Sequence, residues 1–249
     1  MSMSLLRAVT ERRLQPEIID QPDIEPGQLH GALRGLERIN WWSGSARILW
    51  RPIRRLAGER PARPLRILDI ATGAGDVPIR LWRKACRAGV QLEIAGCDRS
   101  GKAVAYARKR AEQQNAPLSF FEWDALKGSF PGEPDVVISS LFLHHLEQDQ
   151  AVEFLRSMAE AARCMVLVND LERNRAGFVL AYLGTRVLSA SSVVHTDGPR
   201  SVEGAFTMPE ANDLARRAGL HGATVERRWP WRYLLSWQRD RTAAALGGG

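Results

Sequence analysis

The sequence of 249 residues predicts an α/β fold, in which helices cover both faces of a mostly parallel β-sheet. Short apolar runs alternate with helical patterns from about residue 65 to residue 169. The intervening segments are long enough for the right-handed crossovers that join parallel strands. Two further apolar runs near the end of the sequence predict an antiparallel hairpin at the sheet edge.

Residues 1–62 are expected to form a helical cap or lid that precedes the α/β domain. A helix is predicted over residues 26–39, because four apolar residues recur there at spacings of four, three and three. Acidic residues precede this helix, as is typical of a helix start. Residues 41–53 form a second stretch, rich in aromatic residues and arginine, that is also expected to be helical.

The α/β domain is expected over residues 63–246, after a linker that contains Pro61 and Pro64. Its predicted strands are residues 65–70, 91–97, 118–123, 134–140, 165–169, 224–229 and 231–237. Its predicted helices are residues 77–88, 102–114, 150–163, 175–189 and one that begins after Thr207, which has capping-box spacing to Glu210. An insertion at about residues 172–206, with a loop through Gly198, is expected to roof a pocket at the carboxyl ends of the strands.

Composition argues against several classes of protein. The formal net charge of +7 would suit a polyanionic partner, but the basic residues are nearly all arginines scattered over the chain, so no nucleic-acid partner is expected. Cys86, Cys97 and Cys164 lack CxxC spacing and indicate reduced thiols. Because neither a long apolar run nor a signal pattern occurs, a cytoplasmic location is expected.

A glycine-containing loop, DIATGAG, follows the first predicted strand and opens a helix, as cofactor-binding loops do. Gly73 and Gly75 permit a close approach of the backbone to a ligand. Asp69 places a carboxylate at the strand end, where it would attract a cationic amino-acid group and repel a pyrophosphate. Ala71 stands where a dinucleotide-binding loop has its first glycine, and Thr72 follows it. The loop therefore favours S-adenosylmethionine over a dinucleotide.

Polar side chains also end the next three predicted strands. Asp98, followed by Arg99, ends the second strand, where a carboxylate can accept hydrogen bonds from both ribose hydroxyls or cap the next helix. Asp124 ends the third strand, where it can accept from an adenine amino group while the Ala125 amide donates to the ring. Ser140 ends the fourth strand, at the edge where ligands bind in open α/β sheets.

Residues 67–170 resemble the class I S-adenosylmethionine-dependent methyltransferase domain, and their LDIATGAGD and SLFLHHL motifs are similar to its ubiquinone/menaquinone methyltransferase-like branch. The resemblance covers a little under half of the chain. It implies a Rossmann-like seven-stranded sheet and methyl transfer to a small molecule. It also implies S-adenosylmethionine as the cofactor, bound by Asp69, Gly73, Gly75, Asp98 and Asp124.

Two flanking segments, NDLER at residues 169–173 and SVEGAFT at residues 201–207, look like bacterial methyltransferases that accompany type III polyketide synthases. This narrower likeness implies O-methylation of a phenolic or alkylresorcinol-like acceptor in secondary metabolism. A quinone-type C-methyltransferase, a non-catalytic S-adenosylmethionine-binding protein and a nicotinamide oxidoreductase remain as alternatives. The fourth-strand motif SSLF lacks the Asn/Asp-Pro-Pro-aromatic run of enzymes that methylate amino groups of nucleic-acid bases.

Three histidines are candidate bases for the acceptor proton. His145, which is preferred, and His144 follow the fourth predicted strand, although each could instead pack or cap a helix. His195 lies in the expected roof, where a solvated loop histidine is the alternative. Asp170 and Arg173 are expected to pair, either to orient an acceptor hydroxyl or to hold the roof. No metal site is expected, because only the adjacent pair His144 and His145 approaches ligand spacing.

The tryptophan-rich segments allow more than one interpretation. Residues 41–53 could form a lid over an apolar acceptor, pack against the sheet, or make peripheral contact with an anionic membrane through their arginines. Trp229, Trp231 and Trp237 are expected in the core, because alternate positions of a strand face one side. The sequence does not indicate an oligomeric state.

Overall fold

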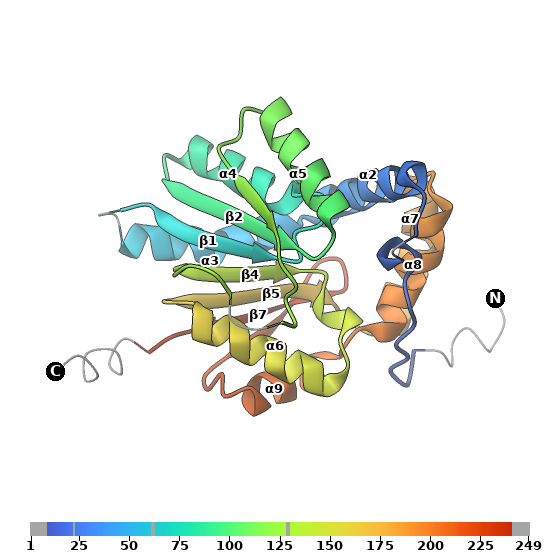
Figure 1. Ribbon diagram of the computed structural model, residues 1–249. Coiled ribbons are helices and arrows are strands. Elements are labelled where there is room, and N and C mark those ends of the chain that lie inside the picture. The colour runs from blue at the N-terminus through green and yellow to red at the C-terminus, as the bar shows by residue number, and fades with distance from the viewer. Residues whose placement is uncertain (1–8, 22, 61–62, 128–129, 241–249) are drawn as a thin grey trace.

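A computed structural model describes residues 9–21, 23–60, 63–127 and 130–240, and it has the predicted α/β architecture (Figure 1). Its seven-stranded sheet has the order β3-β2-β1-β4-β5-β7-β6. The strands are β1 (Leu65–Ile70), β2 (Leu92–Asp98), β3 (Ser119–Glu122), β4 (Val136–Ser140), β5 (Met165–Leu171), β6 (Thr224–Arg228) and β7 (Arg232–Gln238). Strand β7 runs antiparallel to both of its neighbours, β5 and β6, whereas the other strand pairs are parallel. The predicted sheet and its antiparallel edge hairpin are therefore confirmed.

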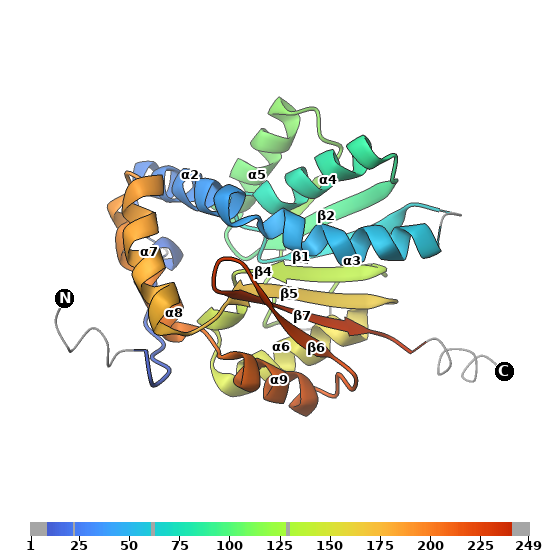
Figure 2. The same ribbon diagram turned by 180° about the vertical axis from the view of Figure 1, so that it is seen from behind.

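Helices cover both faces of the sheet, as predicted. The helical elements are η1 (Ile18–Asp20), α2 (Pro26–Ser43), α3 (Ser45–Glu59), α4 (Asp76–Ala88), α5 (Gly101–Gln113), η2 (Leu143–His145), α6 (Gln148–Ala161), α7 (Arg175–Leu188), α8 (Ser192–Gly204) and α9 (Met208–Arg217). Figure 2 shows α3 and α4 in front of the strands, with α6 and α9 behind them. By contrast, α2, α7 and α8 gather beyond one end of the sheet (Figure 1).

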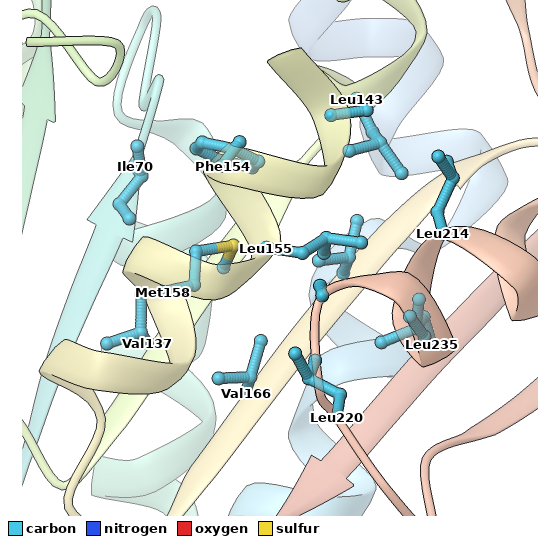
Figure 3. Close-up of a cluster of buried hydrophobic side chains, with 14 of the residues drawn as sticks. Ile70, Val137, Leu143, Phe154, Leu155, Met158, Val166, Leu214, Leu220 and Leu235 are labelled. Atoms are coloured by element: carbon cyan, nitrogen blue, oxygen red, sulfur yellow. The ribbon is translucent and has the colours of Figure 1, made fainter. Parts of the chain in front are cut away.

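The strands carry apolar residues on both faces, because each face is covered by helices. In β1, Leu65 and Ile67 pack with α3 and α4, whereas Leu68 and Ile70 pack with α6 and α9. Figure 3 shows this second layer, in which Phe154 of α6 lies among side chains from the strands. The two layers hold the carboxyl ends of β1, β2, β4 and β5 at one edge.

The expected N-terminal cap has two parts with different surroundings. The second part, α3, buries Leu49 and Ile53 against the central strands, so it is packed in the same core as α4. The first part, α2, contacts α7 and α8 in addition to α3 and α4. Within the described residues, no helix combines the length and hydropathy needed to cross a membrane.

Two expectations about local structure were wrong. Residues around Gly198 form helix α8 rather than a loop, because Gly198 lets α8 pack closely on α7: a Cβ there would lie 2.5 Å from Thr185 Cγ2. Trp229 and Trp231 are 55% and 38% exposed and not in the core, since they occupy the turn between β6 and β7. Trp237 is half-buried at the edge of the α6 and α9 layer.

Candidate functional site

A cavity of about 890 Å³ lies at the carboxyl ends of β1, β2 and β4. In this sheet order, β1 pairs with β2 on one side and with β4 on the other. Strands β2 and β3 are therefore added on one side of β1 and the later strands on its other side, which makes β1 the point where the strand order switches. Ligands bind outside such a switch point in open α/β sheets. Elements α2, α7, α8 and η1 contribute lining residues on the side away from the strands.

Near its carboxyl end, β1 presents a carboxylate with an unpaired oxygen to this cavity. Asp69 is 2% exposed, and its Oδ2 accepts a 2.7 Å hydrogen bond from Thr72 Oγ1. Its Oδ1 is buried without a hydrogen-bond partner among the residues that the structure describes. Burial raises the pKa of Asp69 to about 8, against the effect of the Thr72 hydrogen bond. A ligand that donates a hydrogen bond or carries a positive charge would fit Oδ1.

The backbone of the loop is held in an uncommon conformation. Ala71 has φ of 55° and Gly73 has φ of 53°, so both occupy the left-handed region. That region is unfavourable for alanine, and such positions concentrate at ligand-binding sites. Both residues line the cavity. At position 71, where a dinucleotide-binding loop has glycine, this chain has alanine. Alanine has the smallest side chain after glycine and therefore tolerates this backbone conformation better than a larger residue would.

Gly75 serves packing rather than lining the cavity. A Cβ on Gly75 would lie 2.9 Å from both the Ala107 side chain and the Phe120 ring. The glycine therefore lets the start of α4 approach α5 and β3 closely, which fixes the loop before it. Sequence reasoning grouped Gly75 with Gly73 as a ligand contact, but only Gly73 borders the cavity.

Asp98 lines the cavity at the end of β2 with an oriented carboxylate. Its Oδ2 accepts from the Gly73 amide and its Oδ1 accepts from the Ser100 amide, each at 2.9 Å. An ionised carboxylate has about four lone-pair positions, so each oxygen can accept one more hydrogen bond. Two adjacent hydroxyls of a ligand would satisfy them. Burial raises the pKa of Asp98, and these two amides oppose that rise.

The other predicted cofactor residues also border the cavity, with different exposure. Asp124 is partly exposed, and its Oδ1 accepts from the Leu126 amide at 3.1 Å, beside Ala125. The exposed side chain of Arg99 lies 3.6 Å from Asp20. Ser140 Oγ accepts from the Asn169 side-chain amide at 2.9 Å.

Five side chains form a cluster that we call the histidine–carboxylate cluster: Glu17, Asp20, His144, His145 and Asp170. His144 Nδ1 lies 2.6 Å from Asp170 Oδ1, and His145 Nδ1 lies 3.3 Å from Asp20 Oδ2. Their Nε2 atoms lie 3.7 and 3.9 Å from the two oxygens of Glu17. All but Asp170 line the cavity. The cluster therefore joins the histidines of η2, which follows β4, to carboxylates from two separate segments, the N-terminal segment and β5.

Charges within the cluster shift its titration. Burial alone would lower the pKa of His145, yet the Asp20 contact and the charge of Glu17 raise it to about 9. Burial alone would raise the pKa of Asp170, but the His144 ring lowers it overall. Burial raises the pKa of Glu17, which also accepts a hydrogen bond from Ser201 Oγ.

The segment that carries Glu17 and Asp20 is fixed at several points. The two oxygens of Asp197 in α8 accept from the Ile18 and Ile19 amides, each at 3.0 Å. Further back, the guanidinium of Arg12 donates to the carbonyl oxygens of Gly204 and Leu146. The N-terminal segment therefore bridges α8 and the loop after β4, and it brings its carboxylates over the two histidines.

Two further predicted roles differ from the geometry. His195 lies in α8, where its Nε2 is 2.7 Å from the Ser189 carbonyl oxygen, and it does not line the cavity. Arg173 does not pair with Asp170. It donates to both oxygens of Glu210, at 2.7 and 2.9 Å, and so attaches α9 to the end of β5. Asp170 is occupied by His144, because β5 ends beside η2.

Sequence reasoning missed Glu17, and it treated Asp20 only as part of an acidic stretch before a helix. Neither belongs to a motif with the histidines, from which they are separated by more than 100 positions. The acidic character of the segment was the only available signal. The contact depends on the N-terminal segment crossing the open end of the sheet, which local patterns do not encode.

The half of the cavity beyond the cluster is mainly apolar. Its walls come from the facing sides of α2, α7 and α8 and from the turn before β7. The apolar lining side chains there are Leu33, Leu36, Ile39, Trp42, Leu180, Ala181, Leu188, Val194 and Trp231. One cavity thus combines a polar part at the strand ends with an apolar part beneath the roof.

Comparisons with known proteins agree with this geometry. The Methyltransferase domain family matches residues 67–164. A demethylmenaquinone methyltransferase of Thermus thermophilus is 35% identical over 159 residues, which cover 59% of this chain and 70% of that protein. A ubiquinone biosynthesis O-methyltransferase of Ruegeria pomeroyi is 28% identical over 188 residues, covering 74% and 71% of the two chains.

Solved structures share the fold at low sequence identity. The apo form of the S-adenosylmethionine-dependent methyltransferase SibL has a TM-score of 0.60 and 19% identity, over 96% of this chain and 68% of its own. A magnesium protoporphyrin IX methyltransferase of Synechocystis PCC 6803 with bound SAH has a TM-score of 0.55 and 15% identity, over 95% and 93%. The chain spans half of PigF, solved with SAH, at a TM-score of 0.53 and 19% identity over 70% of this chain.

The strand order, the polar strand ends and these relatives lead to one family. Seven strands with an antiparallel edge hairpin surround a cavity at the carboxyl ends, where the glycine loop and Asp98 meet. The chain belongs to the class I S-adenosylmethionine-dependent methyltransferases, with S-adenosylmethionine as its cofactor and methyl transfer as its activity.

Proposed function

We propose that this methyltransferase methylates a hydroxyl group of a phenolic or alkylresorcinol-like acceptor. The observation that carries the proposal is the continuity of the cavity, which runs from the polar strand ends past the histidine–carboxylate cluster into the apolar part under the roof. Such a cavity suits an aromatic ring with an apolar substituent, held with a polar group at the cluster.

The polar half would hold S-adenosylmethionine, which supplies a methyl group bonded to a positively charged sulfur. Asp98 would accept hydrogen bonds from the two ribose hydroxyls, and Asp124 with the Ala125 amide would contact the adenine. The free Oδ1 of Asp69 would receive the positively charged amino-acid part, which explains a buried carboxylate without a second partner. Gly73 would let the backbone approach this ligand closely.

The apolar half would position the acceptor and exclude water. Aliphatic side chains on α2 and α7 supply a surface for the ring and for an alkyl tail, and burial of each methylene group is worth about 0.8 kcal/mol. Trp42 and Trp231 border the cavity while remaining 38% exposed, so they would lie at its mouth. We propose that residues 1–62 contribute the lid through η1 and α2.

The cluster would take up the proton of the acceptor hydroxyl. A phenol has a pKa of about 10, so few molecules are ionised at neutral pH without assistance. Asp170 contacts His144 Nδ1, which favours the tautomer whose Nε2 faces the cavity as an acceptor. His144 and His145 share this part of the site, whereas His195 lies outside the cavity.

A panel of acceptors tests this function. The purified protein is incubated with methyl-deuterated S-adenosylmethionine and an alkylresorcinol, a catechol or an unmethylated naphthohydroquinone, and products are identified by mass spectrometry and NMR. We expect the label on a phenolic oxygen, and we expect the Asp98→Asn variant to lose the product. Labelling of ring carbon in the naphthohydroquinone alone would replace the proposal with its rival.

The rival function, quinone-type C-methylation, is favoured by the relative from Thermus thermophilus, which is a demethylmenaquinone methyltransferase. The relative from Ruegeria pomeroyi is a ubiquinone biosynthesis O-methyltransferase, and it favours oxygen as the acceptor atom. If S-adenosylhomocysteine binds but no member of the panel is methylated, the acceptor class proposed above is wrong.

The raised pKa of Asp69 predicts that cofactor binding depends on pH. Below about pH 8 the carboxyl is mostly protonated without ligand, and a cationic ligand must displace that proton. We therefore expect affinity for S-adenosylmethionine to rise about tenfold per pH unit from about pH 5.5 to about pH 7, where the ligand's amino group stays protonated. Isothermal calorimetry in buffers from about pH 5.5 to about pH 7 measures this change in affinity.

The Asp69→Asn variant is the control for this prediction. It cannot release the proton, so its affinity should be weaker and its dependence on pH shallower. Because Asp98 also has a raised pKa, a residual slope in Asp69→Asn would measure the contribution of Asp98. An equal slope in the variant and the wild type would show that Asp69 does not bind the cationic part of the ligand.

A further inference from the structure

We propose that Glu17, His144 and His145 form a binding site for a divalent transition-metal ion, with Zn²⁺ the best suited. One potential ligand atom from each of the three side chains lies within 4.8 Å of the others. Two imidazoles and a carboxylate form a ligand set of catalytic zinc sites, which leave one position open. The adjacent histidines alone did not predict this site, because the third ligand comes from the N-terminal segment.

The distances suit a shared ion. Zinc lies about 2.0–2.2 Å from nitrogen and oxygen ligands, so two ligand atoms of a tetrahedral site are about 3.3–3.6 Å apart. The Nε2 atoms of His144 and His145 lie 3.7 and 3.9 Å from the two oxygens of Glu17. These separations are longer than hydrogen bonds and a few tenths of an ångström above the tetrahedral value, so the three side chains would close slightly around an ion. Both histidines therefore face Glu17 within ion-pair distance, where one bound ion would join all three side chains.

Carboxylates on the outer side of both rings support the same interpretation. Histidines that bind metals nearly always donate their second ring N–H to a carboxylate or carbonyl, which fixes the ring and its tautomer. Asp170 lies at Nδ1 of His144, and Asp20 lies at Nδ1 of His145. Both rings thus have their Nδ1 occupied by a carboxylate and their Nε2 directed to the third ligand.

The local charge also favours a cation. The cluster brings together three carboxylates. Among the described residues, the exposed Arg99 lies 3.6 Å from Asp20, and the buried Arg232 interacts electrostatically with Asp170. Glu17 is 8% exposed and Asp170 is fully buried. Buried carboxylates are stable as anions when they are paired or coordinate a metal, and a divalent ion would balance this group.

The three ligands line the cavity, so the open position of the ion would face the acceptor. A bound ion lowers the pKa of a hydroxyl that coordinates it. With the ion bound, both Nε2 atoms are occupied, so the hydroxyl proton would leave to solvent; without the ion, the histidines remain available to take up that proton. This role rests on the proposed function, whereas binding of the metal does not depend on the identity of the acceptor.

Metal binding is measured directly on the full chain after treatment with a chelator. Zn²⁺ is titrated in competition with a chromophoric chelator, and Co²⁺ is added separately to record visible absorption bands of the bound ion. We expect one Zn²⁺ to bind per chain, and we expect the visible absorption bands of bound Co²⁺ to be those of a four-coordinate site. Glu17→Gln and His145→Gln should each weaken Zn²⁺ binding at least about 100-fold, and Asp20→Asn about 10- to 100-fold.

His221→Gln is the matched control, because this histidine lies on an exposed turn away from the cavity. It should bind Zn²⁺ like the wild type. S-adenosylhomocysteine binding shows that each variant is folded. Wild-type affinity for Zn²⁺ no tighter than that of Glu17→Gln would overturn the site, even if chelator-treated protein still methylates phenols. Tight Zn²⁺ binding without methylation of any phenol would instead refute only the proposed acceptor.

Discussion

Replacement of Asp98 by asparagine should weaken S-adenosylhomocysteine binding by at least about 100-fold. The backbone amides of Gly73 and Ser100 already occupy one lone pair on each carboxylate oxygen, and they orient the remaining two. Asparagine has one accepting oxygen, and its NH₂ group would face a donor. Hydrogen bonds to a charged group contribute about 1.5–3 kcal/mol each, so two of them account for this loss.

Isothermal calorimetry of the wild type and the variant measures the change. Asp149→Asn is a matched control, because Asp149 is 92% exposed on α6 and pairs with Arg217 on the surface. It should bind as the wild type does. A thermal unfolding curve separates loss of the ligand contact from collapse of the loop. An Asp98→Asn protein that binds normally would show that the ribose is held elsewhere.

The polar half of the site could be predicted from sequence because its residues follow strands. Carboxyl ends of parallel strands meet at one edge, so Asp69, Asp98 and Asp124 come together once the strands are recognised. The sequence does not distinguish the role of Gly75 from that of Gly73, because the same residue type serves a turn, a ligand contact or close packing. Only the surrounding Ala107 and Phe120 distinguish these roles.

The apolar half of the cavity could not be predicted in the same way. Its roof depends on packing between helices far apart in the sequence, and α8 illustrates the difficulty. Gly198 and Pro199 both disfavour a helix, yet the helix continues through them because the lack of a side chain lets α8 pack on α7. Local propensity was overridden by a tertiary contact.

The same limit applies to the histidine–carboxylate cluster. His144 and His145 were recognised, but their partners lie in the N-terminal segment and at the end of β5. Asp170 was assigned to Arg173, three positions away, whereas the structure pairs it with His144. Proximity along the chain favours Arg173 as the partner of Asp170, because both lie at the end of the fifth strand. The position of η2, which the sequence does not reveal, places His144 beside Asp170 instead.

Replacement of Asp170 by asparagine should lower kcat by about 10²- to 10⁴-fold and leave S-adenosylhomocysteine affinity nearly unchanged. Asp170 fixes the tautomer and orientation of His144, and loss of such a carboxylate lowers kcat by up to about 10⁴-fold in the serine-protease triad. Asparagine can present an NH₂ group to Nδ1 and favour the opposite tautomer. Steady-state kinetics with the phenol that the wild type methylates separates kcat from KM.

A double-variant comparison distinguishes this positioning role from general damage to the fold. If Asp170 acts through His144, then Asp170→Asn combined with His144→Gln should be about as slow as His144→Gln alone, because residues that act as a unit are not additive. Independent roles would instead multiply the two losses. Equal losses in kcat and in S-adenosylhomocysteine affinity would indicate that Asp170 mainly holds the end of β5, and the cluster would then have no part in taking up the proton.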